Sequence, residues 1–366
     1  MAVGLTLTPA ASALSPADPA SSAPSDSRLQ RLVDGIVAAG APGASLVVLD
    51  GSTSRRITSG VSDLDSQRGL RSGDVFRAGS VTKTFVATLT LQLVGDGRLR
   101  LDAPVARYLP GLLPDRGNVT VRQLLNHTSG LFDYSVDPAF SQALFRGEAF
   151  TPRQLVTVST GHPVLGEPGA AFSYSNTNYV VLGMLVRKVG ESSLVSQLEQ
   201  RILAPLGLQH TAFPVVETRL RGPHVHGYVG DPPGQLTDTT TLLNPSWAWA
   251  AGALVSNVTD LARFYRALLD GRLIGSGLLR EMRTTVPLAP GIGYGLGLAS
   301  TSQSCGRAWG HDGLYPGYFD QALSSPDGRR QVVLMMNVDP LNGTPPANVL
   351  RAFRKALDVA FCAGRS

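Results

Sequence analysis

Charge and lysine are scarce in this sequence. Only three of the 32 basic residues are lysines (Lys83, Lys188 and Lys355). Charged residues make up 16% of the 366 positions, against about 25% in soluble proteins. The net charge of +5 is spread without a long basic run, which argues against a nucleic-acid partner. No stretch of about 18 consecutive apolar residues exists, so we expect no membrane span. The 43% of hydrophobic residues fit a globular protein.

Several common catalytic and ligand-binding motifs are also absent. The sequence has no G-x-S-x-G, no H-E-x-x-H, and no glycine-rich phosphate loop between a strand and a helix. His224 and His226 alternate along a possible strand, but no third ligand with suitable spacing accompanies them. We therefore interpret both histidines as structural or surface residues. Nothing indicates a metal or another cofactor.

Cysteine occurs only twice, at Cys305 and Cys362. Two cysteines fit either one disulfide in a secreted protein or two thiols inside a cell. Residues 1–13 (MAVGLTLTPAASA) resemble the end of a secretory signal with an Ala-x-Ala cleavage site, although a basic n-region is missing. Residues 15–27 are typical of a flexible linker. We therefore expect a secreted protein in which a signal remnant and linker (1–27) precede one folded domain (28–366).

The order of hydrophobic patterns predicts an α+β fold. A helical stretch at 29–39 precedes β-like runs at 45–50 and 55–59, and strands return at 308–309, 318–324 and 331–337 before a helix at 347–361. Helical patterns dominate the middle, at 81–94, 120–126, 178–189 and 259–269. We predict one antiparallel sheet built from about 28–75 and 290–366 and flanked by helices, with a mostly helical subdomain inserted at roughly 99–290.

Ser80 and Lys83 form the only S-x-x-K sequence in the chain. Residues i and i+3 of a helix share a face, so the Lys83 amine should point back toward the Ser80 hydroxyl. A neutral lysine can remove the serine proton, which requires that burial or nearby cations lower the lysine pKa. Backbone N–H groups at the helix start can stabilise an oxyanion. The alternative is an ordinary serine N-cap followed by a surface lysine.

Two further motifs follow in the order that an acyl-transfer site needs. Tyr174 and Asn176 lie two residues apart, so in an extended loop the phenol and the amide face the same way. The phenol can pass a proton to a leaving group, and the amide can position both substrate and lysine. His311, Asp312 and Gly313 stand at the start of the C-terminal strands and form the weakest of the three motifs.

Together these motifs resemble the penicillin-recognising serine hydrolases. The most similar branch is that of secreted D-Ala-D-Ala carboxypeptidases, which includes class C β-lactamases, D-aminopeptidases and related esterases. Similar blocks extend from about residue 30 to 362, at 76–83, 124–131, 168–179, 251–261, 294–298 and 310–313. The resemblance implies an antiparallel sheet with flanking helices and a helical subdomain, as the hydrophobic patterns also predict.

The resemblance also implies a role for individual residues. Ser80 would be the acylated nucleophile, Lys83 and Tyr174 would share proton transfer, and Asn176 would contact the substrate amide. His311 takes the position of a lysine in many relatives, and the N–H groups of Ser80 and Leu314 would form the oxyanion hole. The remaining implied positions are Gly313 in the substrate-binding strand, Trp247 as an aromatic wall, His127 as a structural hydrogen-bonding residue, and a Cys305–Cys362 disulfide.

Asp312 departs from the pattern of the carboxypeptidase relatives. They usually carry threonine there and an arginine after the Y-G-L-G-L block, and the two groups bind the terminal carboxylate of the substrate. Here Asp312 would repel a carboxylate, and residues 299–302 contain no arginine. We therefore expect weaker selection for a free C-terminal D-Ala, and better use of amides, esters, internal D-peptide bonds or cationic substrates. Alternatively, Asp312 points away from the cleft or pairs with Arg307.

The sequence thus predicts a secreted, monomeric serine hydrolase that acts on D-amino-acid peptides or peptidoglycan-like substrates through an acyl-serine. The activity would be most like that of a D-Ala-D-Ala carboxypeptidase, and β-lactams should acylate the same serine. The alternatives are a D-stereospecific endopeptidase or aminopeptidase, a class C-like β-lactamase and an esterase. A non-enzymatic alternative is a penicillin-binding sensor that is acylated without turnover.

Overall fold

The structure is a computed structural model that describes residues 26–114, 116–231 and 234–363. The predicted signal remnant and most of the predicted linker lie outside these residues. The last two linker positions, Asp26 and Ser27, instead open the first helix, α1 (Asp26–Ala38). An acidic side chain in the first turn favours this start because it complements the helix dipole, and Asp26 also contacts Arg55.

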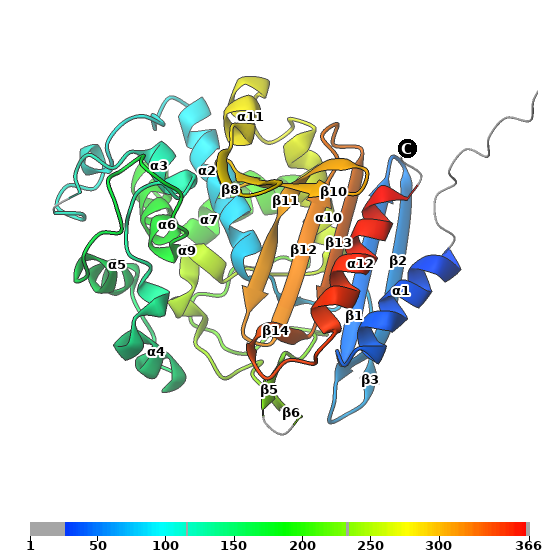
Figure 1. Cartoon of the computed structure of the whole chain (residues 1–366). Coiled ribbons are helices and arrows are strands. Elements are labelled where there is room, and N and C mark those ends of the chain that lie inside the picture. The colour runs from blue at the N-terminus through cyan, green and yellow to red at the C-terminus, as the bar shows by residue number, and fades with distance from the viewer. Residues whose placement is uncertain (1–25, 115, 232–233, 364–366) are drawn as a thin grey trace, which may run out of the picture.

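One nine-stranded sheet organises the molecule and confirms the predicted α+β class (Figure 1). Its strand order is β3-β2-β1-β13-β12-β11-β10-β9-β8, and all its pairs are antiparallel. The N-terminal strands are β1 (Gly43–Asp50), β2 (Thr53–Asp63) and β3 (Arg68–Gly69). The C-terminal strands are β8 (Val286–Ala289), β9 (Ile292–Tyr294), β10 (Ala299–Gln303), β11 (Gly306–Tyr315), β12 (Tyr318–Ser324) and β13 (Arg330–Met336).

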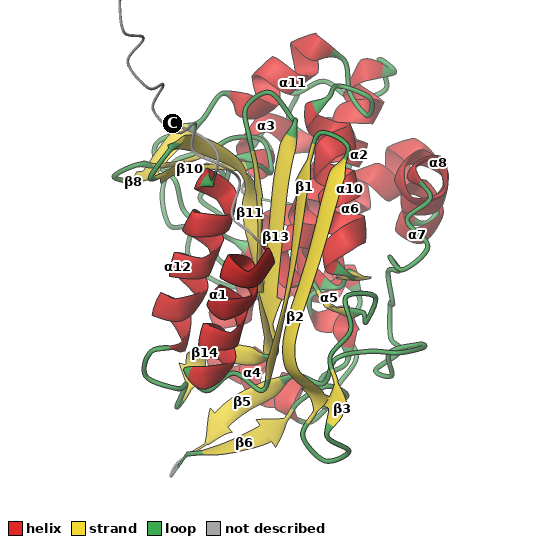
Figure 2. Ribbon diagram, turned by 90° about the vertical axis from the view of Figure 1, so that its right-hand side faces the viewer, coloured by secondary structure: helices red, strands yellow, loops and turns green. Residues whose placement is uncertain are grey.

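The two ends of the chain meet where β1 pairs with β13, with Ala44 opposite Met336. Both strands are almost wholly buried and consist largely of apolar residues, as expected for strands with helices on both faces. Helices α1 and α12 (Val349–Cys362) cover one face of the sheet (Figure 2). On the other face, α10 (Val258–Leu269) packs against β13, β1 and β12. Asn257 caps α10 by accepting a hydrogen bond from the Asp260 N–H, as such a residue should.

Helix α2 (Thr82–Gly95) lies between this sheet and the helical region, and eleven of its residues are buried. It packs against α6 (Asn176–Gly190) and α9 (Trp249–Gly252). The remaining helices are α3 (Val121–Leu125), α4 (Pro138–Phe145), α5 (Pro152–Thr160), α7 (Leu194–Leu198), α8 (Ala204–Leu206) and α11 (Ser276–Arg283). No helix in the described part of the chain is long and apolar enough to cross a membrane.

Two small sheets beside the main one were not predicted. In one, β4 (Phe76–Arg77) pairs with β7 (Val255–Ser256). In the other, β5 (Tyr228–Asp231) lies between β14 (Val338–Gly343) and β6 (Gln235–Asp238). With two to six residues each, these strands are too short to show a clear alternation of apolar and polar positions.

A Cys305–Cys362 disulfide ties the end of α12 to the turn between β10 and β11, which confirms the pairing implied by the family resemblance. The bond joins residues 57 positions apart, so chain entropy alone assigns it a stabilisation of about 4 kcal/mol. Beside it, the Ser304 N–H and hydroxyl both donate to the Asp358 carboxylate. These contacts fasten α12 to the strand that enters the candidate site.

Candidate active site

Ser80 lies in a 3-10 turn, η1 (Gly79–Val81), that leads directly into α2. Gly79 has a φ of +48°, and a Cβ at this position would lie 2.4 Å from the carbonyl oxygen and 2.8 Å from the nitrogen of Leu314. Only glycine therefore allows the turn to pack directly on β11. This packing brings the backbone at Ser80 close to the Leu314 N–H, the second donor expected for an oxyanion hole.

Lys83 lies wholly inside the protein, directly beneath Ser80. Its Nζ donates to Ser80 Oγ at 2.9 Å, to Asn176 Oδ1 at 2.8 Å and to the Ala251 carbonyl at 2.7 Å. Burial lowers the pKa of Lys83 to about 7, although the carboxylates of Asp133 and Asp312 oppose this shift. The alternative of an N-cap with a surface lysine is wrong, since Ser80 caps no helix and Lys83 is buried.

Tyr174 contacts the same serine, and its hydroxyl lies 2.8 Å from Ser80 Oγ. The residue is 36% exposed and lines the cleft. Desolvation within the site raises the pKa of Tyr174 well above its usual value, with Asp312 and Asp133 adding to the effect. Tyr174 therefore keeps its proton at neutral pH and can donate it.

Asn176 is the first residue of α6, and its amide is held in one orientation. Its oxygen accepts from Lys83, while its Nδ2 donates to Asp133 Oδ2 at 3.2 Å and to Ser135 Oγ at 3.0 Å. Asp133 and Ser135 were not predicted as site residues. Both follow the 124–131 block directly, and this position was the only sequence signal that could have found them.

His127 supports Tyr174 from behind. The imidazole is buried and stacks on the Tyr174 ring at a centroid distance of 4.3 Å. Its Nδ1 accepts a hydrogen bond from the Ser175 N–H at 3.2 Å. Burial holds the pKa of His127 well below its usual value, so the ring is neutral. These contacts fit the predicted structural role.

His311 lies on β11 and is buried in the wall of the cleft. Its Nε2 pairs with the Tyr294 hydroxyl at 2.8 Å, and its Nδ1 lies 2.6 Å from the Asp312 carbonyl oxygen. Burial lowers the pKa of His311, although the Asp312 carboxylate opposes the shift. The imidazole is therefore neutral, unlike the lysine that many relatives carry here. Tyr294 was not predicted as a site residue, although it opens the 294–298 block.

The Asp312 side chain is 60% exposed and lies at the rim of the cleft. Its Oδ1 is 3.6 Å from Nδ1 of the neighbouring His311. Arg307 donates instead to Ser300 Oγ at 3.0 Å, so the alternative of an Asp312–Arg307 pair is wrong. The Asp312 carboxylate is therefore accessible to a substrate in the cleft.

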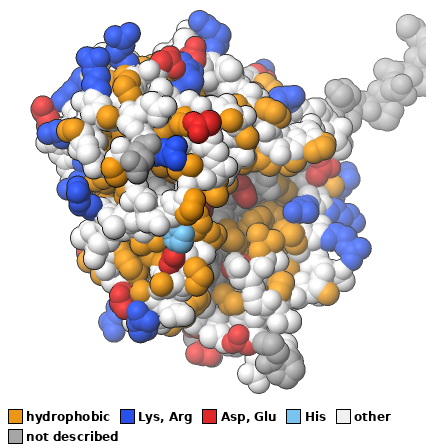
Figure 3. All heavy atoms as spheres, turned by 60° about the vertical axis from the view of Figure 1, so that its left-hand side comes forward, with side chains coloured by type: hydrophobic (Ala, Val, Ile, Leu, Met, Phe, Trp, Pro, Cys, Tyr) orange, Lys and Arg blue, Asp and Glu red, His pale blue; other side chains and the backbone are white. Residues whose placement is uncertain are grey.

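The cleft around Ser80 has a volume of about 1360 Å³ and continues well beyond the reacting atoms. Its lining includes Trp247, whose Nε1 donates to the Tyr315 hydroxyl at 3.1 Å. Exposed apolar residues, including Leu288 and Ile292, also line it. Figure 3 shows a hollow on one face with apolar side chains gathered along it. Trp247 therefore lies in the lining of the cleft, and its role as an aromatic wall for the substrate stays a prediction.

The strand beside this cleft has a free edge. β10 pairs with β11 only as far as Gly310, opposite Ala299. Beyond that point, residues 311–315 pair with β12 on one side, and the cleft is lined by His311, Asp312, Leu314 and Tyr315. Gly313 belongs to this segment, and a Cβ there would lie 2.3 Å from the Ala78 carbonyl oxygen. An extended substrate can therefore lie against the backbone of β11.

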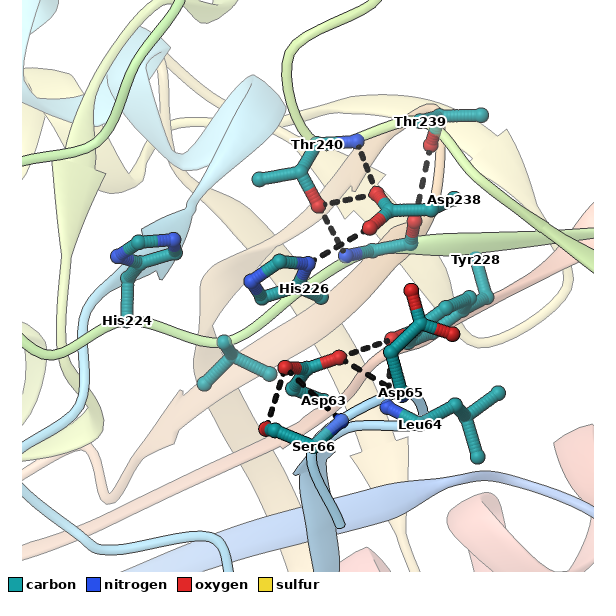
Figure 4. Close-up of polar contacts among 12 residues, drawn as sticks. Asp63, Leu64, Asp65, Ser66, His224, His226, Tyr228, Asp238, Thr239 and Thr240 are labelled. Carbon is teal, nitrogen blue, oxygen red and sulfur yellow. Dashed lines mark hydrogen bonds and ion pairs between the residues drawn. The ribbon is translucent and has the colours of Figure 1, made fainter. Parts of the chain in front are cut away.

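His224 and His226 lie away from this cleft, near the turn between β2 and β3 (Figure 4). His226 Nδ1 is 2.6 Å from Asp238 Oδ2, while His224 Nδ1 contacts the Gly222 carbonyl at 2.8 Å. The two rings stack at 5.1 Å. Within the described ranges, no group of three or more His, Cys, Asp or Glu residues could hold a metal ion.

Comparison with known proteins agrees with this geometry. The sequence profile of the family described as Beta-lactamase matches residues 29–356. A D-stereospecific amidohydrolase from Streptomyces sp. is similar in structure, with a TM-score of 0.80 and 39% identity, covering 90% of this chain and 98% of that one. A D-amino acid amidase from Ochrobactrum anthropi SV3, complexed with D-phenylalanine, is similar with a TM-score of 0.83 and 30% identity. The match covers 92% of this chain and 98% of the amidase. Penicillin-binding protein 4* of Bacillus subtilis (strain 168) is 30% identical over 295 residues, 76% of this chain, which spans 64% of that relative's length.

Proposed function

Because this chain belongs to the β-lactamase family, we propose that it is a serine hydrolase that cleaves D-amino-acid amides and peptides through an acyl-Ser80 intermediate. The observation that carries the proposal is the position of Ser80 Oγ, 2.9 Å from the buried Lys83 amine and 2.8 Å from the Tyr174 phenol. The names of the similar structures, a D-stereospecific amidohydrolase and a D-amino acid amidase, support the substrate class.

In the proposed acylation step, neutral Lys83 takes the Ser80 proton as Oγ attacks the substrate carbonyl. The negative charge that develops on the carbonyl oxygen is stabilised by the N–H groups of Ser80 and Leu314. Tyr174 donates its proton to the leaving nitrogen and the C–N bond breaks. The protonated Lys83 amine, whose Nζ lies 4.8 Å from the centroid of the Tyr174 ring, then returns the proton to the phenolate. Water then attacks the ester by the reverse path, which releases the acid and free Ser80.

Asp312 favours amides and internal peptide bonds over a free C-terminal D-Ala. Two unit charges about 4 Å apart interact by about 1 kcal/mol in water and by about 4 kcal/mol near a protein surface. The carboxylate of a D-Ala-D-Ala peptide would meet this repulsion at the cleft rim, whereas a primary amide would not. D-Ala-D-Ala carboxypeptidase activity is therefore the less favoured variant of the same chemistry.

A substrate panel with wild type and Ser80→Ala tests the proposal. The panel should contain D- and L-phenylalanine amide, a D-Ala-D-Ala peptide, a chromogenic cephalosporin and a nitrophenyl ester. We expect turnover of the D-amide, discrimination against the L-amide, and loss of both activity and β-lactam labelling in Ser80→Ala. Full activity of Ser80→Ala would refute the mechanism, and single labelling of wild type without turnover would indicate a penicillin sensor instead.

We also propose that the protein is secreted and monomeric. The Cys305–Cys362 disulfide supports secretion, because such bonds persist mainly in oxidising compartments. Expression of the full chain in its own host, with fractionation of cells and medium, tests the location. Sedimentation of the purified protein tests the oligomeric state.

A further inference from the structure

Asp320 is a buried carboxyl group that the proposed reaction does not use. It lies on β12 with 1% of its surface exposed, and neither carboxyl oxygen has a hydrogen-bond partner among the described residues. An ionised carboxylate in such a place costs several kcal/mol unless it is paired. Burial raises the pKa of Asp320 well above its usual value, and the nearby Asp312 carboxylate adds to the rise. Burial therefore favours the protonated, neutral form of this carboxyl group.

The carboxyl group lies at the junction between β11 and the turn that carries Ser80. Asp320 is opposite Gly313 in the β11–β12 register. A Cβ on Gly313 would lie 2.1 Å from Asp320 Oδ2 and 2.3 Å from the carbonyl oxygen of Ala78. The carboxyl, the Ala78 carbonyl and the Gly313 backbone therefore converge on one point, two residues before the nucleophile.

Two oxygens that converge in this way repel each other unless a proton lies between them. A protonated carboxyl supplies that proton, since its O–H is a donor. The Ala78 carbonyl already accepts from the Val81 N–H at 3.1 Å within the 3-10 turn. A carbonyl oxygen has two lone pairs, so it can accept a second hydrogen bond.

We propose that Asp320 is a positioning residue whose protonated carboxyl donates a hydrogen bond to the Ala78 carbonyl and holds the Ser80 turn against β11. The turn and the strand each provide one N–H of the expected oxyanion hole, Ser80 from the turn and Leu314 from the strand. Asp320 fixes the distance between these two donors without contacting the substrate. This role rests on the function proposed above.

The competing explanation is that Asp320 is an unpartnered polar group that only lowers stability. The two accounts differ for Asp320→Leu, which removes the donor, and for Asp320→Asn, which keeps a donor in the same place. Ser324→Ala is a matched control, because Ser324 lies on the same face of β12, is fully buried, and its hydroxyl also has no partner among the described residues.

We expect Asp320→Leu to keep the thermal stability of the wild type or exceed it, because an apolar side chain replaces a buried polar one. Its kcat should nevertheless fall by about 10- to 100-fold at nearly unchanged KM, the scale on which a displaced oxyanion donor slows catalysis. Asp320→Asn should recover most of that loss, and Ser324→Ala should match the wild type. Wild-type kcat in Asp320→Leu, or an equal loss in the Leu and Asn variants, would overturn the proposal.

A second measurement does not depend on finding a substrate. Infrared difference spectra at neutral pH between wild type and Asp320→Asn should show the carbonyl stretch of one protonated carboxylic acid, shifted by hydrogen bonding. Absence of this band would overturn the proposed role of Asp320. If the band is present but wild-type Ser80 is neither acylated nor active, the proposed function fails while the buried acid and its hydrogen bond stand.

Discussion

The pKa of Lys83 sets the pH at which Ser80 can be activated. With a pKa of about 7, half of the lysine is neutral at neutral pH, and the neutral fraction falls about tenfold for each pH unit below that. Only the neutral amine can accept the serine proton, so kcat/KM at pH 5 should be about one hundredth of its plateau. The Tyr174 phenol has a pKa well above its usual value, and the plateau should therefore extend into alkaline pH.

The fall of kcat/KM at acidic pH forms the acid limb of the pH profile. Removing either carboxylate near Lys83 should shift the midpoint of this limb. Asp133 and Asp312 both raise the pKa of Lys83, so Asp133→Asn and Asp312→Asn should each lower that pKa. The midpoint of the kcat/KM profile then shifts to lower pH, and activity at pH 5 rises relative to the plateau. Asp102→Asn removes an exposed carboxylate paired with Arg122 and should leave the midpoint unchanged.

The assay is the initial rate at low substrate concentration across the pH range, with stability checked at each pH. A midpoint that stays in place in both Asn variants would refute the assignment of the acid limb to Lys83. A midpoint that moves equally in Asp102→Asn would show only a response to net charge.

Three further predictions follow from the same contacts. Tyr174→Phe removes the proton donor and should lower kcat on amides by about 10²- to 10⁴-fold, with a smaller loss on nitrophenyl esters, whose leaving group needs no proton; an equal loss on both substrates would contradict this role. Asp312→Thr should raise the ratio of D-Ala-D-Ala peptide to D-amide turnover about tenfold or more, and an unchanged ratio would remove Asp312 from the specificity argument. Lys83→Met should abolish acylation yet raise the melting temperature at pH 7. The folded state lowers the pKa of Lys83 from 10.5 to about 7, so between these pH values the unfolded chain binds a proton that the folded chain does not. The stability of the wild type therefore rises as the pH increases from 7 to about 10.5. The difference in melting temperature between Lys83→Met and the wild type should shrink over the same range.

The parts of the site that could be predicted from the sequence are those fixed by local geometry. Ser80 and Lys83 lie three residues apart at a helix start, and Tyr174 and Asn176 lie two apart, so short spacings determine how each pair faces. The resemblance to a known family indicated that the three motifs come together in one site. The cysteine pair could be assigned in the same way.

The other site residues reach the site only because segments far apart in the sequence pack against each other. The Ala251 carbonyl and Tyr294 come from segments far along the chain, and nothing in their own neighbourhood indicates a contact with Lys83 or His311. Asp320 reads as an ordinary polar residue in a strand until the register places it opposite Gly313. A local pattern can predict which residues form a helix or strand. It cannot predict which of their side chains a neighbouring element will bury.

The pairing of β1 with β13 has a consequence for the order of folding. The Gly43 N–H bonds the Asn337 side chain across 294 positions of sequence, so the central part of the sheet closes only when nearly the whole chain is available. Such non-local contacts slow folding, because a long loop must be closed before its contacts form. Until then β1 presents an open edge that other chains could join. The central strands of the sheet therefore cannot pair until residues 330–337 have been synthesised.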